Sequence, residues 1–309
     1  MALALGDVVV GWREGADHRL RQYDSGGASL GFVAFDLGNM AQRVAIYGDT
    51  SIYVTMFSGS ILSGFARYDA NLTKVWEHIY AHSDPLRVND PDPNFRPIGI
   101  SVGGSPSAIG VDDVVYVCSY NAPYQIRKYS ADNVLLDTFE DLTAGFYYMH
   151  VNEDEQVAYL NDGVSMAVDR YDLQSRAMLS PILTVPAPYD VITDLKQKPD
   201  GRFLISVRDN PATNPRIGAL DIAADTTIAQ TYSDTNGWCE AVGYDGEDAL
   251  WMHRSTVFKK WNVTSGVLEL SVTPPASMAS NGAIGVVYRY PPSGPTTAAN
   301  ARAWGHVIG

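Results

Sequence analysis

The sequence predicts an all-β protein, a closed six-bladed β-propeller with four antiparallel strands in each blade. Three observations predict this architecture. One strand pattern recurs along the chain, and a second marker strand follows almost every copy of it. The first copy is also incomplete, and a matching surplus strand lies near the C-terminus. Internal repeats of this kind are typical of propellers and solenoids.

The first marker is a run of apolar, β-branched and aromatic residues that directly follows an acidic or glycine-containing turn, as in a β-hairpin. Six such runs occupy residues 8–13, 51–57, 114–120, 156–162, 202–208 and 249–254. Their starts lie 43, 63, 42, 46 and 47 residues apart. Most steps therefore match the length of one propeller blade, and the step of 63 carries a proline-rich insertion at residues 83–107.

The second marker is a basic strand that ends in an aromatic and a small polar residue. It reads Arg-Gln-Tyr-Asp at 21–24, Arg-Tyr-Asp at 67–69, Arg-Lys-Tyr-Ser at 127–130, Arg-Tyr-Asp at 170–172 and Lys-Lys-Trp-Asn at 259–262. The fifth repeat is degenerate, with Ala-Leu-Asp at 219–221. The final Asp or Asn is expected to begin a turn, because its side chain can accept a hydrogen bond from the backbone two residues further on.

A short strand is also expected upstream of each acidic turn, and it supplies the innermost strand of each blade. These strands are predicted at residues 44–47, 108–111, 149–152, 192–197 and 241–244. Residues 1–6 are too few to supply one for the first repeat, whereas residues 283–287 fit the pattern and have no further strands after them. Pairing this last strand with the N-terminal three closes the ring and leaves no long exposed edge.

The alternatives to a closed ring are an open solenoid and a two-sheet sandwich. The predicted domain covers residues 1–290. Residues 291–309 begin Pro-Pro-Ser-Gly-Pro and are predicted to form a loosely ordered tail.

The repeated basic-aromatic strand resembles the blades of the lactonase, NHL and quinoprotein-like propellers over residues 7–287. The Gly-His and Trp-Asp pairs of WD40 blades and the aspartate box of sialidases are missing, and the six tryptophans do not repeat in register. The resemblance implies a ligand site on one face, at the mouth of the central channel. It does not imply an activity, because propeller folds serve many functions.

Composition limits the partners of the chain. It has 22 Lys and Arg against 35 Asp and Glu, for a net charge of −13, which disfavours nucleic acid and anionic membranes. The N-terminus lacks the basic start and apolar run of a signal peptide, and no stretch has the length of a membrane span. We therefore expect a virion or cytoplasmic location. Cys118 and Cys239 are expected to be reduced thiols, since two distant cysteines do not form a disulfide framework.

Candidate ligand-binding residues lie in the loops that the propeller model places at the channel mouth. They are Tyr120, Tyr124, Tyr147, His150, Tyr189, Arg208, Asp209, Trp238 and His253. Aromatic platforms beside planar polar groups could bind a sugar or a peptide. The alternative is that the aromatic side chains pack on one another and that the histidines are structural.

Sequence motifs for chemistry are weak. The six histidines lack metal-ligand spacing, and no Gly-x-Ser-x-Gly motif is present. Residues 90–94, Asp-Pro-Asp-Pro-Asn, space oxygen side chains as calcium loops do, but Phe95 stands where the glycine should follow. We therefore predict no catalytic residue, no metal and no cofactor.

The leading hypothesis is a non-enzymatic recognition or assembly module that binds a protein or a carbohydrate. A narrower hypothesis makes it an accessory virion protein of a bacteriophage, because isolated propellers occur there and because the use of 16 Arg against 6 Lys suits a GC-rich host. The competing hypotheses are a lactonase- or lyase-like enzyme, with acids, histidines and a divalent ion at the channel mouth, and a sugar-binding lectin.

Overall fold

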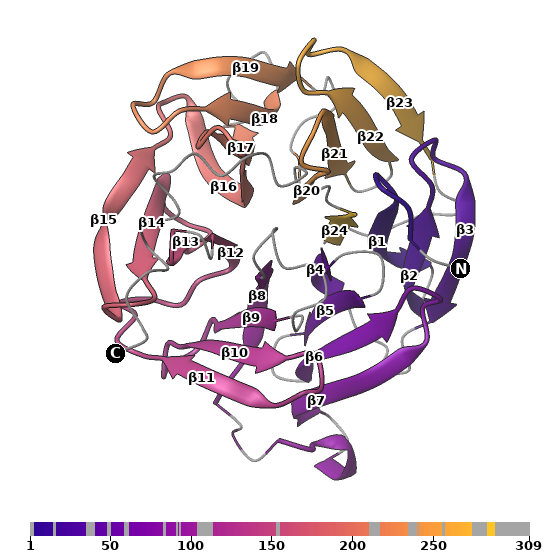
Figure 1. Cartoon of the computed structure of the whole chain (residues 1–309), viewed down its shortest axis with the longest axis vertical. Coiled ribbons are helices and arrows are strands. Elements are labelled where there is room, and N and C mark those ends of the chain that lie inside the picture. Colours follow the sequence, from indigo (N-terminus) through magenta and orange to yellow (C-terminus); the bar gives the residue numbers. More distant parts are fainter. Residues whose placement is uncertain are drawn as a thin grey trace, which may run out of the picture.

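A computed structural model of the chain shows six four-stranded sheets arranged around a central axis (Figure 1). It describes residues 3–14, 17–34, 41–47, 51–58, 62–82, 85–90, 92, 94–103, 114–152, 155–209, 217–233, 239, 241–254, 257–273 and 283–287. The predicted tail, 291–309, lies outside the described residues. Neighbouring strands within each sheet are antiparallel, so the predicted six-bladed propeller is confirmed.

The bounds of the strands follow the repeat. Blade 1 contains β24 (Ala283–Val286), β1 (Val8–Glu14), β2 (Asp17–Tyr23) and β3 (Ser29–Ala34), and blade 2 contains β4 (Ala41–Tyr47), β5 (Ser51–Ser58), β6 (Leu62–Asp69) and β7 (Lys74–His82). Blade 3 contains β8 (Pro97–Gly103), β9 (Val114–Ser119), β10 (Ile126–Ser130) and β11 (Leu135–Phe139), and blade 4 contains β12 (Tyr148–Asn152), β13 (Val157–Asn161), β14 (Ala167–Asp172) and β15 (Ala177–Thr184). Blade 5 contains β16 (Tyr189–Gln197), β17 (Phe203–Asp209), β18 (Ile217–Ile222) and β19 (Ile228–Ser233), and blade 6 contains β20 (Ala241–Tyr244), β21 (Ala249–Arg254), β22 (Val257–Asn262) and β23 (Leu268–Val272). A short 3-10 helix, η1 (Pro85–Arg87), follows β7.

The ring closes as predicted, through a blade built from both ends of the described chain. Strand β24 pairs with β1, with Val286 opposite Val8 and Ala283 opposite Gly11. The Val287 amide also donates to the Asp7 carbonyl at 2.9 Å. In Figure 1, β24 occupies the innermost position of blade 1. The last strand therefore supplies the inner strand that the N-terminal segment lacks.

The aspartates that end the third strands begin tight turns. The Asp24 carboxylate accepts hydrogen bonds from the amides of Gly26 and Ala28 at 2.9 and 2.8 Å. The Asp69 carboxylate binds the amides of Asn71 and Thr73 in the same way. This confirms the predicted role of the repeated Tyr-Asp pair, which ends one strand and fixes the hairpin to the next.

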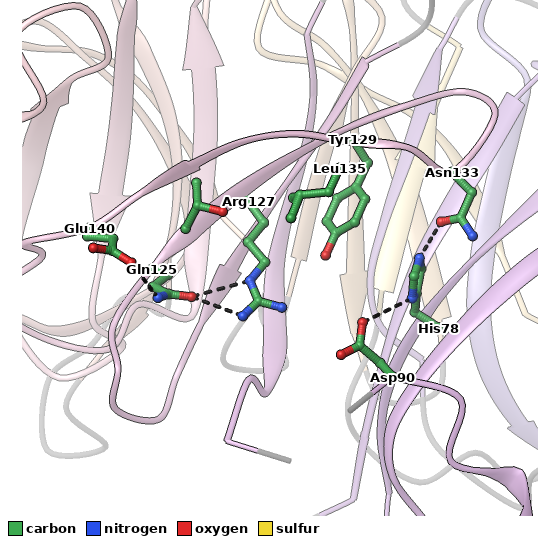
Figure 2. A pocket seen from close by; sticks show the side chains of 9 residues that line it. His78, Asp90, Gln125, Arg127, Tyr129, Asn133, Leu135 and Glu140 are labelled. Atoms are coloured by element: carbon green, nitrogen blue, oxygen red, sulfur yellow. Dashed lines mark hydrogen bonds and ion pairs between the residues drawn. The ribbon is translucent and has the colours of Figure 1, made fainter. Parts of the chain in front are cut away.

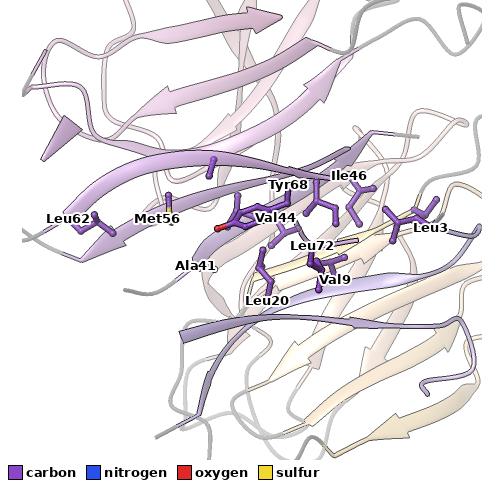
Figure 3. Close-up of a cluster of buried hydrophobic side chains, with 14 of the residues drawn as sticks. Leu3, Val9, Leu20, Ala41, Val44, Ile46, Met56, Leu62, Tyr68 and Leu72 are labelled. Atoms are coloured by element: carbon purple, nitrogen blue, oxygen red, sulfur yellow. The ribbon is translucent and has the colours of Figure 1, made fainter. Parts of the chain in front are cut away.

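Apolar side chains fill the space between adjacent blades. Between blades 1 and 2, Val9 and Leu20 pack with Val44, Ile46 and Met56 (Figure 3). Cys118 and Cys239 are buried and form no disulfide, as expected, and burial raises the pKa of the Cys118 thiol to about 12. No helix in the described part of the chain is long and apolar enough to cross a membrane.

One strand differs from the prediction. The innermost strand of blade 3 is β8, within the proline-rich insertion, whereas the predicted segment 108–111 lies outside the described residues. Pro97 and Gly99 explain why the strand was missed, because both residue types are disfavoured in strands although Ile98 and Ile100 alternate as a strand requires. A Cβ at residue 99 would lie 2.4 Å from the Cys118 Sγ atom. The position therefore requires glycine for close packing and not for a turn.

Candidate functional site

Two of the predicted site residues meet on the face that carries the loops between second and third strands. The rings of Tyr120 and Tyr147 lie 4.4 Å apart, and Phe57 and Tyr148 extend the cluster on either side at 6.5 and 6.2 Å. Burial, followed by hydrogen bonding with Tyr120, raises the pKa of the Tyr147 hydroxyl. These aromatic side chains therefore pack on one another, and only Tyr120, 37% exposed, offers much surface.

The other predicted residues do not join this cluster. Tyr124 packs at the edge of the core that contains Cys118, and Tyr189 packs on the core of blade 5. Arg208 is exposed on β17. Trp238 and the side chain of Asp209 lie outside the described part of the structure. A ligand bound by these residues stays a prediction.

His253 is buried within the propeller, and His150 on β12 is partly buried. Burial lowers the pKa of both imidazoles to about 3, and the nearby Lys196 ammonium adds to the effect on His150. Both rings are therefore neutral over the physiological range. A general base works best when its pKa lies near the operating pH, so these values fit structural histidines better than catalytic ones.

Arg43 is a channel residue that the sequence analysis missed. Its guanidinium lies 4.4 Å from the centre of the Tyr148 ring in blade 4 and 3.4 Å from the Thr193 carbonyl oxygen in blade 5, the blade opposite its own. Its Nε atom is buried and has no hydrogen-bond partner among the described residues. The side chain thus reaches across the central channel. Arg43 is also the sole charged residue of β4, which is the signal that could have identified it.

A groove of about 450 Å³ lies at the outer rim, between blades 2 and 3 (Figure 2). It is formed by β7, β10, β11 and the connection that precedes β8. Its lining is mostly polar and consists of His78, Asp90, Gln125, Arg127, Tyr129, Asn133, Leu135, Thr138 and Glu140. The volume falls within the ordinary range of small-molecule sites.

His78 is fixed on one side of the groove. Its Nδ1 atom lies 3.4 Å from the Asp90 Oδ2 atom, and its Nε2 atom contacts the Asn133 Oδ1 atom. The ring stacks on Phe65 at 5.1 Å and on Tyr80 at 5.9 Å, with interplanar angles of 14° and 18°. Both ring nitrogens of His78 are therefore engaged by side chains of the protein, and the ring positions its neighbours.

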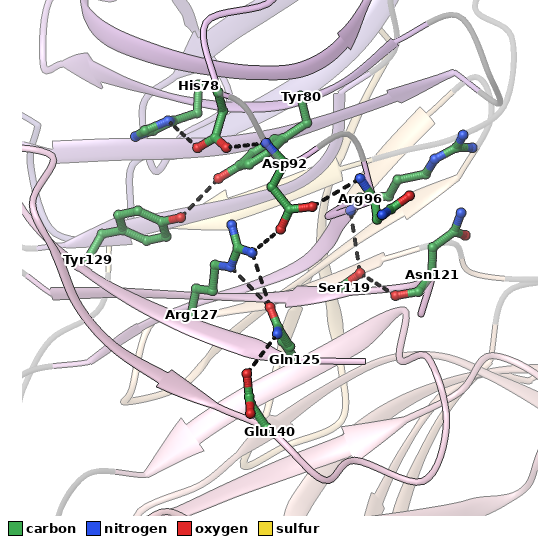
Figure 4. Close-up of polar contacts among 12 residues, drawn as sticks. His78, Tyr80, Asp92, Arg96, Ser119, Asn121, Gln125, Arg127, Tyr129 and Glu140 are labelled. Carbon is green, nitrogen blue, oxygen red and sulfur yellow. Dashed lines mark hydrogen bonds and ion pairs between the residues drawn. The ribbon is translucent and has the colours of Figure 1, made fainter. Parts of the chain in front are cut away.

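Arg127 is fixed on the other side. Its guanidinium pairs with the Asp92 carboxylate and donates from Nε and NH2 to the Gln125 Oε1 atom at 3.2 and 3.1 Å (Figure 4). The Gln125 amide in turn donates to the Glu140 Oε1 atom at 3.1 Å. Burial alone would lower the pKa of Arg127, but hydrogen bonding with Asp92 raises it above its ordinary value. The guanidinium also lies 4.0 Å from the centre of the Phe95 ring.

A buried pair of tyrosines, Tyr80 and Tyr129, lies between His78 and Arg127, and Tyr129 of this pair lines the groove. The hydroxyls of Tyr80 and Tyr129 lie 2.9 Å apart. Burial raises the pKa of both phenols, so they remain protonated hydrogen-bonding groups. Their rings are packed away from solvent, and a ligand in the groove would reach Tyr129 at its hydroxyl edge.

The walls of the groove are tied to blade 2. The Trp76 indole and the Arg67 guanidinium both donate to the Ala131 carbonyl, at 2.8 and 3.0 Å, and so hold the β10–β11 turn. On the opposite wall, the Asn89 side chain accepts from the Ile79 amide at 2.6 Å and donates to the Glu77 carbonyl at 2.9 Å. Both sides of the groove are therefore anchored to β7 and its neighbour β6.

The sequence pointed to part of this groove for a different reason. Residues 90–94 were considered as a calcium loop, but Asp90 faces His78 and Asp92 faces Arg127. No cluster of three or more His, Cys, Asp or Glu side chains in the described residues could hold a metal ion. The carboxylates of the Asp-Pro-Asp segment instead bind side chains of the protein. The proline-rich insertion at residues 83–107, which breaks the repeat, is the sequence feature that could have indicated the groove.

Comparisons with known proteins identify the fold. No family model matches the chain, and no curated protein matches it. Among solved structures, a protein of unknown function from Bacteroides caccae aligns with a TM-score of 0.62 and 9% identity, over 91% of this chain and 98% of that chain. A chain from the crystal structure of a nidogen/laminin complex aligns equally well, with a TM-score of 0.62, 9% identity, and coverage of 91% and 99%. At this identity the likeness is one of fold alone.

Proposed function

We propose that this chain is a non-enzymatic recognition or assembly module and that it binds its partner at the groove between blades 2 and 3. One observation carries the proposal. The principal polar side chains of the groove, His78, Arg127 and Gln125, are each held by two or more protein groups before any ligand arrives. Binding then costs little side-chain entropy, which favours affinity.

The state of the polar groups favours binding over turnover. A hydrolytic or lyase-type reaction needs a base or nucleophile that can give or take a proton at the reacting atom. In the groove, both nitrogens of His78 are engaged and Arg127 is held by an ion pair. Fixed groups of this kind suit a recognition site, and the carboxylate oxygen that stays available, Glu140 Oε2, belongs to an exposed side chain.

The narrower assignment, to a bacteriophage virion, is supported by the low lysine content noted above. A propeller related in fold also occurs in a complex of two proteins, nidogen and laminin. Mass spectrometry of purified particles tests the assignment. Stoichiometric recovery of the chain with the particles supports a virion role, and its absence from them while it is abundant in the lysate contradicts that role.

Crystallographic soaking with a library of small polar fragments tests the groove. We expect the bound fragments to gather between His78 and Glu140 and to contact the Thr138 hydroxyl, because fixed hydrogen-bonding groups favour fragment binding. Thr138→Val should reduce fragment occupancy. Thr184→Val, on the equivalent outer strand of blade 4, is the matched control and should not. Fragments that bind only around Tyr120 and Tyr147 would show that the groove is not the site.

A further inference from the structure

The charges in the groove alternate in sign. Figure 2 shows Arg127 between Asp90, beside His78 at one end, and Glu140 at the other. An anionic group that approached Arg127 would meet a carboxylate on either side, and the net charge of −13 adds to that repulsion. The Arg127 guanidinium is itself paired with the Asp92 carboxylate, so it presents little positive charge to a ligand. This order disfavours phosphates and acidic peptides, and the hydrogen-bonding groups of the groove decide between the remaining ligand classes.

The groove also keeps unused hydrogen-bonding capacity. The Asn133 side-chain amide uses one end with His78 and keeps the other end for a ligand. Glu140 uses Oε1 with Gln125 and retains Oε2 as an acceptor. The Thr138 hydroxyl, which can both donate and accept, also lines the groove. Donors and acceptors are therefore interleaved at short spacing, which suits ligand groups that donate and accept at the same atom, as hydroxyls do.

One edge of the groove is apolar. Leu135 is 49% exposed, and its neighbours Val134 and Leu136 are exposed to a similar degree. A pyranose ring presents C–H groups on one face and hydroxyls around its rim. Such a ring could place its C–H face on Leu135 and direct its hydroxyls toward Thr138 and Glu140. Burial of the leucine surface would add a favourable apolar contribution.

We infer that the groove binds a carbohydrate, that is, a neutral saccharide whose hydroxyls bond to Asn133, Thr138 and Glu140 while one ring face rests on Leu135. The inference rests on the proposed function and names the ligand class of the same site. The groups that hold this geometry, among them Asp90, Asp92 and Gln125, lie in segments next to β7 and β10, and they are bonded to one another and to their neighbours before a ligand binds. The ligand would therefore not need to reshape the groove.

The test begins with an array of immobilised neutral oligosaccharides, and the saccharides that bind are then titrated in solution by calorimetry. Glu140→Gln replaces the charged acceptor with a neutral amide, and Thr138→Val removes the hydroxyl, each with little change of shape. We expect each variant to bind about 2- to 12-fold more weakly, the range for loss of one hydrogen bond. Glu269→Gln and Thr184→Val are controls on other outer strands and should bind as the unmodified chain does.

Two charged probes, hexalysine and hexaglutamate, distinguish a wrong ligand class from a wrong binding site. We expect neither to bind in a way that depends on Glu140 or Thr138. Binding of hexalysine that is lost in Glu140→Gln would overturn the carbohydrate assignment and leave the groove as a recognition site. If no saccharide and no charged probe responds to these variants, and soaked fragments also avoid the groove, the proposed function fails together with the ligand class.

Discussion

The hub and the rim of the propeller use polar side chains differently. In the hub, the six innermost strands β24, β4, β8, β12, β16 and β20, polar groups join one blade to the next. Asp194 of blade 5 accepts the Val242 amide of blade 6 at 3.1 Å, and the Ser101 hydroxyl of blade 3 accepts the Val151 amide of blade 4 at 2.9 Å. In the rim groove, the side chains of Asn133 and Glu140 keep hydrogen-bonding atoms that no described protein group uses.

This difference separates the parts of the molecule that maintain the fold from the part that is available to a ligand. A hub bond that is lost leaves a buried group unsatisfied, which is costly because water cannot replace the partner. A rim bond that is lost is replaced by water. Removal of hub groups should therefore lower stability, whereas removal of rim groups should lower affinity and leave stability almost unchanged.

The largest effect is expected from removing the last hub strand. A chain that ends at Pro274 lacks β24, and with it the buried side chains Ile284, Val286 and Val287. Burial of three such residues contributes roughly 5–9 kcal/mol, which is comparable with the whole stability of many domains. We expect this chain to lose cooperative thermal unfolding, as measured by calorimetry or circular dichroism.

Its control is a chain that ends at Gly294, which keeps β24 and removes only residues 295–309 of the predicted tail. Its melting temperature should match that of the full chain. If the chain that ends at Pro274 melts cooperatively within a degree or two of the full chain, the inner strand of blade 1 does not hold the ring closed.

The next effect comes from two histidines, His150 on the hub strand β12 and His253 on β21, and it depends on pH. The folded-state pKa of His150 and of His253 is about 3, below the ordinary value of 6.5, so the unfolded chain takes up these protons first. Stability is therefore fully present above pH 6.5 and is lost as the pH falls toward 3. Between pH 7 and pH 5 each histidine should cost about 2 kcal/mol of unfolding free energy.

Urea unfolding at the two pH values measures this loss. His150→Gln and His253→Gln should each make the loss smaller by about 2 kcal/mol, because the glutamine does not titrate. The comparison uses the difference between pH values, so a uniform destabilisation by the substitution does not affect it. NMR provides a second measurement: a ring that protonates near pH 6 in the folded protein would contradict the lowered pKa.

Much of the fold could be predicted from the sequence, because strands and turns leave local patterns. The Tyr-Asp pairs predicted the hairpin turns, and the surplus strand near the C-terminus predicted that the ring of blades closes. Strand β8 was missed since Pro97 and Gly99 weaken its pattern, and only contact with Cys118 explains the glycine. Local sequence cannot report a requirement that comes from another strand.

The site was harder to predict for the same reason. Tyr120 and Tyr147 could be paired because the repeat places them on one face of adjacent blades. The groove depends on His78 and Asn133, which lie 55 residues apart and meet only through the packing of blade 2 on blade 3. Arg127 looked like one more copy of the basic marker strand, and its partner Asp92 lay in an insertion that resembled a calcium loop.

The smallest effect compares two carboxylates, one in each region. Asp194 is buried and accepts hydrogen bonds from the amides of Leu195 and Val242 as well as from Lys196, whereas Glu140 is exposed. Asp194→Asn should lower the free energy of unfolding by about 1–3 kcal/mol, because one amide group cannot accept all three bonds and the ammonium loses its counter-charge. Glu140→Gln should change it by no more than about 0.5 kcal/mol, as expected for an exposed site. Urea unfolding at pH 7 measures both values under the same conditions. Equal losses for the two variants would mean that the groove is part of the structural framework, and weaker saccharide binding by Glu140→Gln would then reflect a damaged fold and not a lost ligand contact.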